Sequence, residues 1–276
     1  MTSIEQNYHL IRQDLVAACC RAGRNPEDVR IVAVSKTVGP AEIAQAISAG
    51  IEDFAENRTV LFRQRSKAFP QQRWHFIGVI QTNKVKDFAG HATLVHSVAS
   101  ERALRAIDAR MALLAQDAAL LAPDACMARS LREAPMTLRA QEEHMALRAQ
   151  SEHPALNIKD AVADVFRQPV LIEVNVSGET SKDGIASARL EDLLQIATTM
   201  EHISIKGLMT MAPLGNPSEA RATFSGLREL RDTLAVRFQD TENVCLSELS
   251  MGMTDDYTIA IEEGSTIIRI GRALWS

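Results

Sequence analysis

The sequence predicts an α/β protein built as one (β/α)8 barrel, and three observations support that prediction. Eight short apolar runs alternate with segments of helical periodicity along the 276 residues. The runs are rich in Val, Ile and Leu, as expected for parallel strands that are covered on both faces. Most of them end at a residue suited to binding or chemistry. The competing fold, an open doubly wound sheet, requires a Gly-rich dinucleotide loop after an early strand, and the sequence has none.

Strands and helices are expected in strict alternation over most of the chain. The expected strands are Arg30–Ser35, Glu52–Ala55, Trp74–Ile77, Leu94–Ser97, Val170–Val176, Ile205–Met209, Leu246–Ser250 and Thr266–Ile270. The expected helices are Pro40–Ala49, Arg58–Lys67, Asn83–Phe88, Ser187–Met200, Pro217–Phe238 and Asp255–Glu263. Pro40 suits a first helical turn, and Gly50 and Gly264 suit the residue that follows a helix. Apolar residues recur at helical spacing from Ile4 to Cys19, which predicts a helix there and not a signal peptide.

Residues Ala99–Pro169 interrupt the alternation between the fourth and fifth strands. Apolar residues three and four apart predict one amphipathic helix up to Pro123; they are Leu104, Ile107, Met111, Leu114, Ala118 and Leu121. A short repeat then begins at Leu138 and again at Leu147. Its period of nine turns a helix by roughly 900°, so the two copies face opposite sides. The pattern favours a duplicated surface insertion over a partner surface or lid. We expect one domain over residues 1–276, with 99–169 as an enlarged helical insertion.

The composition excludes several classes of protein. Apolar residues make up 46% and charged residues 24% of the chain, as in an ordinary globular protein. A net charge of -5 gives no electrostatic reason to bind nucleic acid or an anionic membrane. No apolar run is long enough to cross a bilayer. The four cysteines show no metal or redox spacing, which indicates idle thiols in a reducing cytoplasm and no metal site.

A lysine follows the first strand at the end of the barrel where functional groups gather. Lys36 comes directly after Ser35, and an amine in that place can attack an aldehyde. The most natural aldehyde is one that also carries a phosphate, because a candidate anion site follows the last two strands. Pyridoxal 5'-phosphate, held as a Schiff base on Lys36, is therefore the expected cofactor.

The anion site is expected in the loops after the seventh and eighth strands, which commonly bind phosphate in this fold. Gly252 would let backbone N–H groups approach an anion, and Ser250 and Thr254 would add hydroxyl donors. Gly271 and Arg272 follow the eighth strand.

An arginine near the end of the eighth strand is expected to point into the barrel. A buried guanidinium needs a partner. For Arg269 that partner is either the pyridine nitrogen of the cofactor, which it would keep unprotonated, or a carboxylate such as Glu173. The residues leave both possibilities open. His75 lies inside a strand, where a lone histidine is more often a hydrogen-bonded core residue than a catalyst.

Seven short motifs, in order along the chain, resemble the pyridoxal phosphate homeostasis protein family. They are Ala33-Val34-Ser35-Lys36-Thr37, Glu56-Asn57, His75-Phe76-Ile77-Gly78, Asn175-Val176-Ser177-Gly178-Glu179, Gly207-Leu208-Met209-Thr210-Met211, Ser250-Met251-Gly252-Met253 and Arg269-Ile270-Gly271. The resemblance covers nearly the whole chain outside Ala99–Pro169. The sequence departs from the family pattern at Ala55, which replaces a glycine, and at Arg272, where a small hydroxyl residue is common.

The resemblance implies a barrel similar to the N-terminal domain of alanine racemase, with pyridoxal phosphate on Lys36 and its ring nitrogen facing Arg269. The phosphate would be held mostly by backbone amides. The cofactor-binding residues implied are Lys36, Asn57, His75, Ser177, Met209, Ser250, Gly252, Met253, Arg269, Gly271 and Arg272. Family members look like non-catalytic carriers or regulators that hold the cofactor and deliver it to apo-enzymes. We expect a monomer or weak dimer.

Two enzymatic functions are the alternatives. A pyridoxal-phosphate-dependent amino-acid racemase needs bases on both faces of the cofactor. Alanine racemase takes its second base, a tyrosine, from a further domain, and the tyrosines here are Tyr8 and Tyr257. Tyr257 is expected on the helix after the anion loop, which makes it a poor second base. A class I aldolase would need an acid–base pair near Lys36, and His75 is the histidine best placed by sequence. The non-enzymatic function is therefore favoured.

Overall fold

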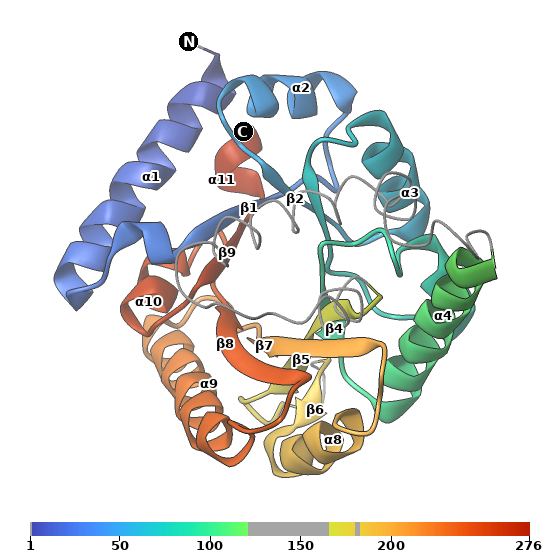
Figure 1. Ribbon diagram of the computed structural model, residues 1–276. Coiled ribbons are helices and arrows are strands. Elements are labelled where there is room, and N and C mark those ends of the chain that lie inside the picture. Colours follow the sequence, from blue (N-terminus) through green and yellow to red (C-terminus); the bar gives the residue numbers. More distant parts are fainter. Residues whose placement is uncertain (1, 121–165, 180–182) are drawn as a thin grey trace, which may run out of the picture.

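Eight parallel strands close into a ring, and the helices lie outside it (Figure 1). The computed structural model describes residues 2–120, 166–179 and 183–276. The ring strands are β1 (Arg30–Val34), β2 (Asp53–Glu56), β3 (Arg73–Phe76), β4 (Leu94–Val98), β5 (Gln168–Asn175), β7 (Ile203–Met209), β8 (Val244–Ser250) and β9 (Ile267–Ile270). Their order is β4-β3-β2-β1-β9-β8-β7-β5, and a β4–β5 pairing completes the circle. The predicted (β/α)8 barrel is confirmed.

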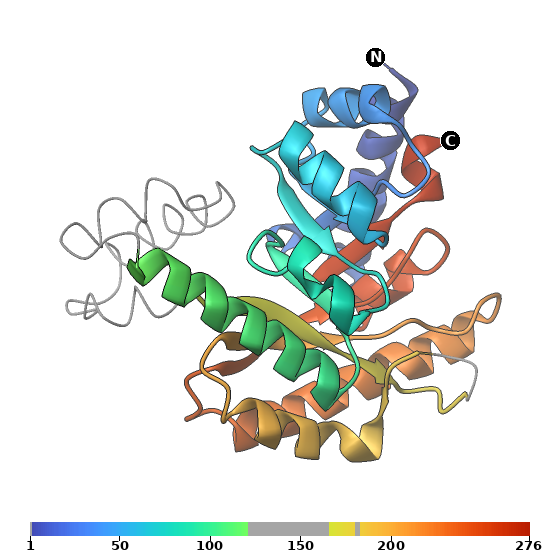
Figure 2. The ribbon, with the colours of Figure 1, turned by 90° about the vertical axis from the view of Figure 1, so that its right-hand side faces the viewer.

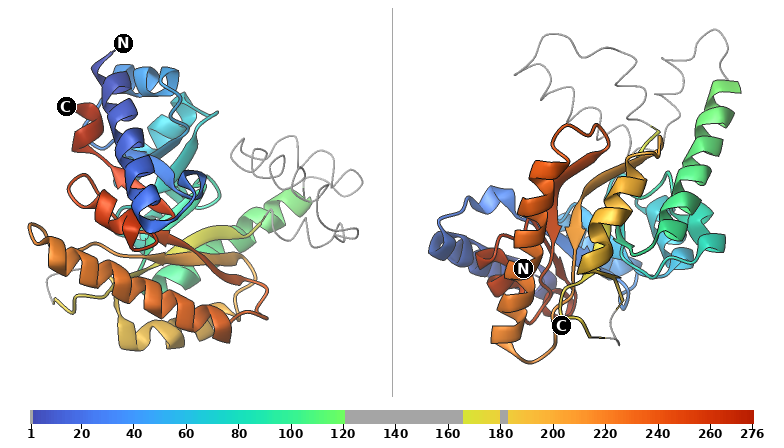
Figure 3. Two further views of the ribbon diagram at one scale, coloured as in Figure 1. Left: turned by 90° about the vertical axis from the view of Figure 1, so that its left-hand side faces the viewer. Right: turned by 90° about the horizontal axis from the view of Figure 1, so that it is seen from below.

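The helices follow the predicted alternation closely. They are α1 (Ser3–Ala22), α2 (Pro40–Ser48), α3 (Thr59–Ala68), α4 (Glu101–Leu120), α8 (Leu190–Ala197), α9 (Pro217–Arg237), α10 (Tyr257–Glu262) and α11 (Arg272–Trp275), with the 3-10 helices η1 (Pro26–Asp28), η2 (Thr82–Asp87) and η3 (Ser187–Arg189). On the outside of the barrel, α1 packs against α10 and α11 (Figure 3). None of the helices in the described part of the chain combines the length and apolar character needed to span a membrane.

Several local features differ from the sequence prediction, among them the short helices η1 and α11, which were not predicted. The segment expected as a helix over Asn83–Phe88 is the 3-10 helix η2, a form that proteins use for short connections. The helix expected over Ser187–Met200 begins as η3 and ends early, because the amides of Thr199 and Met200 bond to carbonyls only three residues back. A two-residue strand, β6 (Ile185–Ala186), pairs with β5 outside the ring and was not predicted.

The side chains of the strands alternate between two separate cores. Outward residues such as Ala33, Phe54 and Trp74 pack beneath the helices. Their sequence neighbours point inward, where a small apolar cluster fills part of the barrel; it consists of Val32, Val34, Ala55, Leu94, Leu171, Met209 and Ile267. Buried polar and charged side chains, including His75 and Arg269, complete the interior.

The long interval after β4 begins with the amphipathic helix that the sequence predicts. Leu104, Ile107 and Met111 are buried on one side of α4, which lies along the outside of the barrel (Figure 2). The repeat at Leu138 and Leu147 lies outside the described residues, so the surface-insertion and lid interpretations both remain expectations.

Candidate functional site

Lys36 sits on a tight turn whose two ends are held by one buried arginine. The amide of Val38 donates to the carbonyl of Ser35 at 3.0 Å, and Lys36 is exposed between them. Beneath the turn, Arg65 of α3 donates from Nη1 to the Ser35 carbonyl at 2.7 Å and from Nη2 to the Val38 carbonyl. The backbone that carries the amine is therefore fixed at both ends.

A buried carboxylate at the end of β2 balances this guanidinium. Oε1 of Glu56 accepts from Nη1 of Arg65, and it also accepts from the hydroxyl of Ser35 at 2.9 Å. Glu56 is fully buried, and its Oε2 has no hydrogen-bond partner among the residues that the structure describes. The pair forms a charged anchor under the Lys36 turn, and both charges depend on each other for compensation.

Barrel closure brings the Lys36 turn beside the last strand. In the β1–β9 ladder Ala33 lies opposite Ile270, so Lys36 and Gly271 follow neighbouring strand ends. On the other side of β1, Asn57 follows β2 and is exposed. Its backbone lies so close to Gly78 that a Cβ on Gly78 would be 2.0 Å from the Asn57 carbonyl oxygen. Only glycine at that position allows this approach.

The loop after β8 has the geometry of an anion cradle. Gly252 has φ +92°, and a Cβ there would lie 2.6 Å from the Cβ of Ala260. Within the described part of the chain, no hydrogen-bond partner accompanies the backbone amides of Gly252, Gly271 and Arg272. The Met253 amide is instead occupied, because it donates to Oδ1 of Asp256 at 2.6 Å. Free amides at neighbouring strand ends can donate hydrogen bonds to an anion without strain.

Arg269 is buried in the barrel, and among the described residues its guanidinium bonds to neutral acceptors. Nη1 donates to Oγ of Ser250 at 2.6 Å, and Nη2 donates to the carbonyl of Thr210 at 3.0 Å. The ion pair with Glu173 that the sequence left open does not form. Burial lowers the pKa of Arg269 to about 10, so the guanidinium is still charged near neutral pH. Burial, with a smaller effect from Asp183, raises the pKa of Glu173 to about 7.

The remaining predicted residues occupy varied positions. Met209 is part of the inner apolar cluster. Ser177 is exposed beyond β5, and its hydroxyl donates to Oδ1 of Asn175 at 3.4 Å. Arg272 is exposed, and its Nη2 pairs with Oδ2 of Asp255 at 2.6 Å. Any contact of Arg272 with an anion in the cradle would thus come from its backbone amide.

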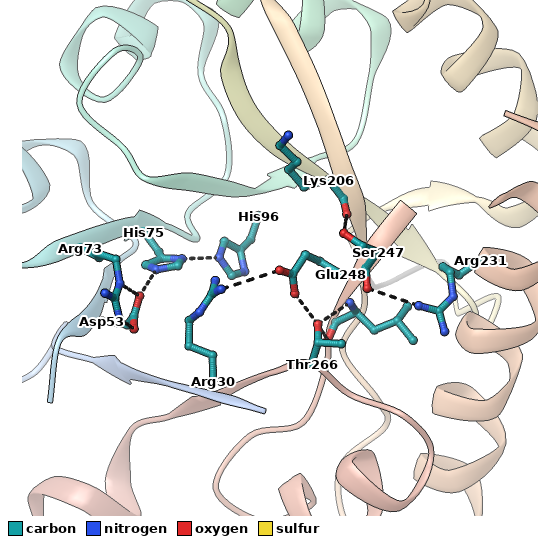
Figure 4. Close-up of polar contacts among 11 residues, drawn as sticks. Arg30, Asp53, Arg73, His75, His96, Lys206, Arg231, Ser247, Glu248 and Thr266 are labelled. Atoms are coloured by element: carbon teal, nitrogen blue, oxygen red, sulfur yellow. Dashed lines mark hydrogen bonds and ion pairs between the residues drawn. The ribbon is translucent and has the colours of Figure 1, made fainter. Parts of the chain in front are cut away.

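His75 is a buried residue with two polar partners, Asp53 and His96, neither of which the sequence predicted. It lies between Asp53 and His96, as Figure 4 shows. The N···O distance to Asp53 and the N···N distance to His96 are both 2.9 Å. His96 could have been found from its place two residues after Leu94, which puts both on the inward side of β4. Nothing in the sequence marks Arg65, whereas Asp256 follows the Ser250-Met251-Gly252-Met253 motif as part of an Asp255-Asp256 pair. The described residues contain no group of three or more His, Cys, Asp or Glu side chains that could hold a metal ion.

The curated relatives that the chain matches all carry one family name. No family model matches the chain. The chain is 34% identical over 261 residues to the pyridoxal phosphate homeostasis protein of Aquifex aeolicus, covering 94% of this chain and 91% of that protein. The structure of PipY from Synechococcus elongatus with PLP bound is similar at a TM-score of 0.67 and 25% identity, over 96% of this chain and 100% of that one. Alanine racemase from Corynebacterium glutamicum shares the fold alone, at a TM-score of 0.60 and 12% identity over 99% of this chain and 60% of that one.

The charged anchor predicts how substitutions beneath Lys36 change stability. Arg65→Met leaves the carboxylate of Glu56 buried without a counter-charge, so we expect the free energy of unfolding to fall by about 3 kcal/mol. Adding Glu56→Gln removes that charge and should restore part of the loss. Arg63→Met is the control on the same helix, because Arg63 is largely exposed and its pair with Asp87 contributes at most about 1 kcal/mol. Urea unfolding measures all three; equal effects of Arg65→Met and Arg63→Met would contradict the anchor.

Proposed function

The chain belongs to the pyridoxal phosphate homeostasis protein family, and from this membership we propose that it binds pyridoxal 5'-phosphate as a non-catalytic carrier or regulator of that cofactor. The observation that carries the proposal is the convergence of three features at one end of the barrel. These are the exposed Lys36 on an anchored turn, the cradle around Gly252, and the buried guanidinium of Arg269. They come from β1, β8 and β9, which are consecutive in the ring.

The residues present fit the two reactive ends of this cofactor. The amine of Lys36 would form a C=N bond with the aldehyde, releasing one water. The amides of Gly252, Gly271 and Arg272 would bind the phosphate, as would that of Met253 once Asp256 releases it. Asn57, His75, Ser177 and Met209 would line the site, as the family resemblance implies, and Ser250 would act from behind Arg269.

A guanidinium next to the pyridine ring favours binding of the cofactor without activating it for catalysis. Bound pyridoxal phosphate normally supplies an electron sink, and the sink is strongest when the ring nitrogen is protonated. Arg269 stays charged and can only donate hydrogen bonds, so it favours an unprotonated ring nitrogen. The residue therefore supports binding without strong activation.

The tyrosines of the chain give no support to the racemase alternative. The hydroxyl of Tyr257 donates to Oδ2 of Asp14 at 2.7 Å, which attaches α10 to α1 on the outside of the barrel. Tyr8 lies on α1 itself. A second base on the opposite face from Lys36 is thus not evident among the described residues. We further propose that residues 1–276 form one cofactor-binding domain, that 99–169 is an insertion within it, and that apo-enzymes in the cytoplasm receive the cofactor.

Loss of the amine should abolish the covalent link. We expect the purified protein with pyridoxal phosphate to absorb at the visible edge of the ultraviolet and Lys36→Ala to lose that band, because the amine proposed to condense with the aldehyde is removed. Lys67→Ala, at an exposed position on α3, is the control and should keep the band. A wild-type protein that stays colourless with added pyridoxal phosphate would refute the proposed function.

We expect the loop around Gly252 to bind the phosphate group and not the pyridine ring. Gly252→Ala places a methyl group against Ala260, so we expect affinity for pyridoxal phosphate to fall at least about 10-fold, the loss of one or two hydrogen bonds to a charged group. Affinity for pyridoxal, which lacks the phosphate, should change much less. Gly264→Ala is the control, because Gly264 also has a positive φ, +102°, but lies just after α10, outside the loop that follows β8. Equal losses for the two ligands would show that the loop does not hold the phosphate.

Sustained racemisation should be absent. With one candidate base, Lys36, the loaded protein should exchange the α-proton of L-alanine slowly at most and should accumulate no D-alanine. Chiral chromatography over hours measures the isomers, and alanine racemase at equal concentration is the positive control. Steady D-alanine production that Lys36→Ala abolishes would favour the racemase alternative.

A further inference from the structure

A continuous line of hydrogen bonds crosses the barrel interior and ends on Arg269. We call its first four members the histidine relay; they are Asp53, His75, His96 and Ser250. Three successive distances of 2.9 Å join them, and Ser250 Oγ then accepts from Arg269 at 2.6 Å. Figure 4 shows the part from Asp53 to His96. Every member is buried, and the side chains of His75, His96 and Ser250 are fully so.

The relay joins strands that are not neighbours in the sheet. His96 comes from β4 and Ser250 from β8, and in the ring β5 and β7 lie between these strands on the shorter side. The bond between His96 and Ser250 therefore passes through the interior and not along a ladder. At the opposite end, Asp53 accepts two further bonds from Arg73, at 2.8 and 2.6 Å. The line starts at a charged pair near the N-terminal ends of the strands and reaches the guanidinium proposed to face the cofactor.

The chemistry of the groups fixes where the protons lie. The hydrogen bonds of Arg73 and His75 hold the pKa of Asp53 far below its usual range despite burial, so its carboxylate only accepts. His75 must therefore donate from Nε2. Arg73 already balances the charge of Asp53, so His75 has no need of a second proton, and its Nδ1 accepts from Nε2 of His96.

The proton positions on His96 and Ser250 follow in the same way, by matching each donor to an acceptor. Burial, together with the positive charges of Arg269 and Arg30, lowers the pKa of His96 well below its usual value, so this ring is neutral. With its one proton on Nε2, its Nδ1 accepts the hydroxyl proton of Ser250. The Ser250 oxygen is then turned with a lone pair toward Arg269, which can only donate. All groups are satisfied in this one direction.

We propose that the histidine relay is a positioning device: it fixes the Arg269 guanidinium toward the ring nitrogen of bound pyridoxal phosphate. This role rests on the function proposed above. It assigns the Ser250 hydroxyl to Arg269 and His96, so that this hydroxyl does not bind phosphate. In the described structure no carboxylate pairs with Arg269, and its other hydrogen bond goes to the backbone carbonyl of Thr210. The relay supplies a second point of attachment, which stops the planar guanidinium from rotating.

The proton arrangement can be tested without cofactor. Long-range nitrogen–proton NMR of the full-length free protein at pH 7.5 should show His96 and His75 both neutral, each with its proton on Nε2. The readout is independent of binding, so it stands even if the wild-type protein fails to bind pyridoxal phosphate. A His96 ring protonated on Nδ1, or a doubly protonated His75, would overturn the assigned direction and with it the proposal.

Substitution tests the effect on Arg269. His96→Leu removes both bonds of the central ring, so we expect the dissociation constant for pyridoxal phosphate to rise about 10-fold while the Lys36-dependent absorption band persists with a shifted maximum. Ser250→Ala should act in the same direction and serves if His96→Leu does not fold. His96→Gln, which can both donate and accept, should recover part of the affinity. His202→Leu, at a half-buried histidine outside the relay, is the control.

The outcomes separate the two proposals. A wild-type protein that binds, with folded His96→Leu and Ser250→Ala variants of unchanged affinity and unchanged band position, would refute the relay and leave the proposed function intact. A larger loss of affinity for pyridoxal phosphate than for its analogue lacking the ring nitrogen would support the relay, because only the former ligand uses Arg269. Equal losses for both ligands would refute it.

Discussion

The site depends on the pairing of the first strand of the barrel with the last. Lys36 and Gly271 lie at opposite ends of the sequence, and only the β1–β9 ladder makes their strand ends neighbours. Closure must also set the register, because a shift by one residue would turn Arg269 from the interior toward the helices. The inward direction of β9 side chains is therefore both a packing requirement, met by Ile267, and the condition for a guanidinium inside the barrel.

Buried charge around the candidate site is compensated in two different ways. Under the Lys36 turn, Arg65 meets a carboxylate directly, and the backbone carbonyls of the turn take its remaining N–H groups. Around Arg269 the hydrogen-bond partners in the described structure are neutral, and the carboxylates of Glu173 and Asp256 act on its charge without a direct ion pair. The first arrangement fixes backbone; the second leaves a positive group able to act on a ligand. Both depend on hydrogen bonds that exclude competing water.

The sequence was sufficient for the barrel and for the ends of its strands, since periodicity and strand-end chemistry are local properties. Every predicted strand has a counterpart in the ring, and the positions of Lys36, Gly252 and Arg269 follow from where strands end. What it could not supply were contacts between distant strands. His96 and Asp53 are unremarkable in their own segments, and their meaning arises only when β2, β3, β4 and β8 surround one interior. The choice of partner for Arg269 was open for the same reason.

The Arg73–Asp53 pair at the far end of the relay is a surface position from which the candidate site can be affected at a distance. Arg73 is 39% exposed on its side chain, whereas Asp53 beside it is buried. A substitution of Arg73 would alter how firmly the Asp53 carboxylate is held. In the proposed relay, that change would pass through His75, His96 and Ser250 to Arg269. Related proteins could thus differ in the rate at which they release the cofactor while every residue that contacts it stays the same. An engineered change at Arg73 could alter that release rate in the same way.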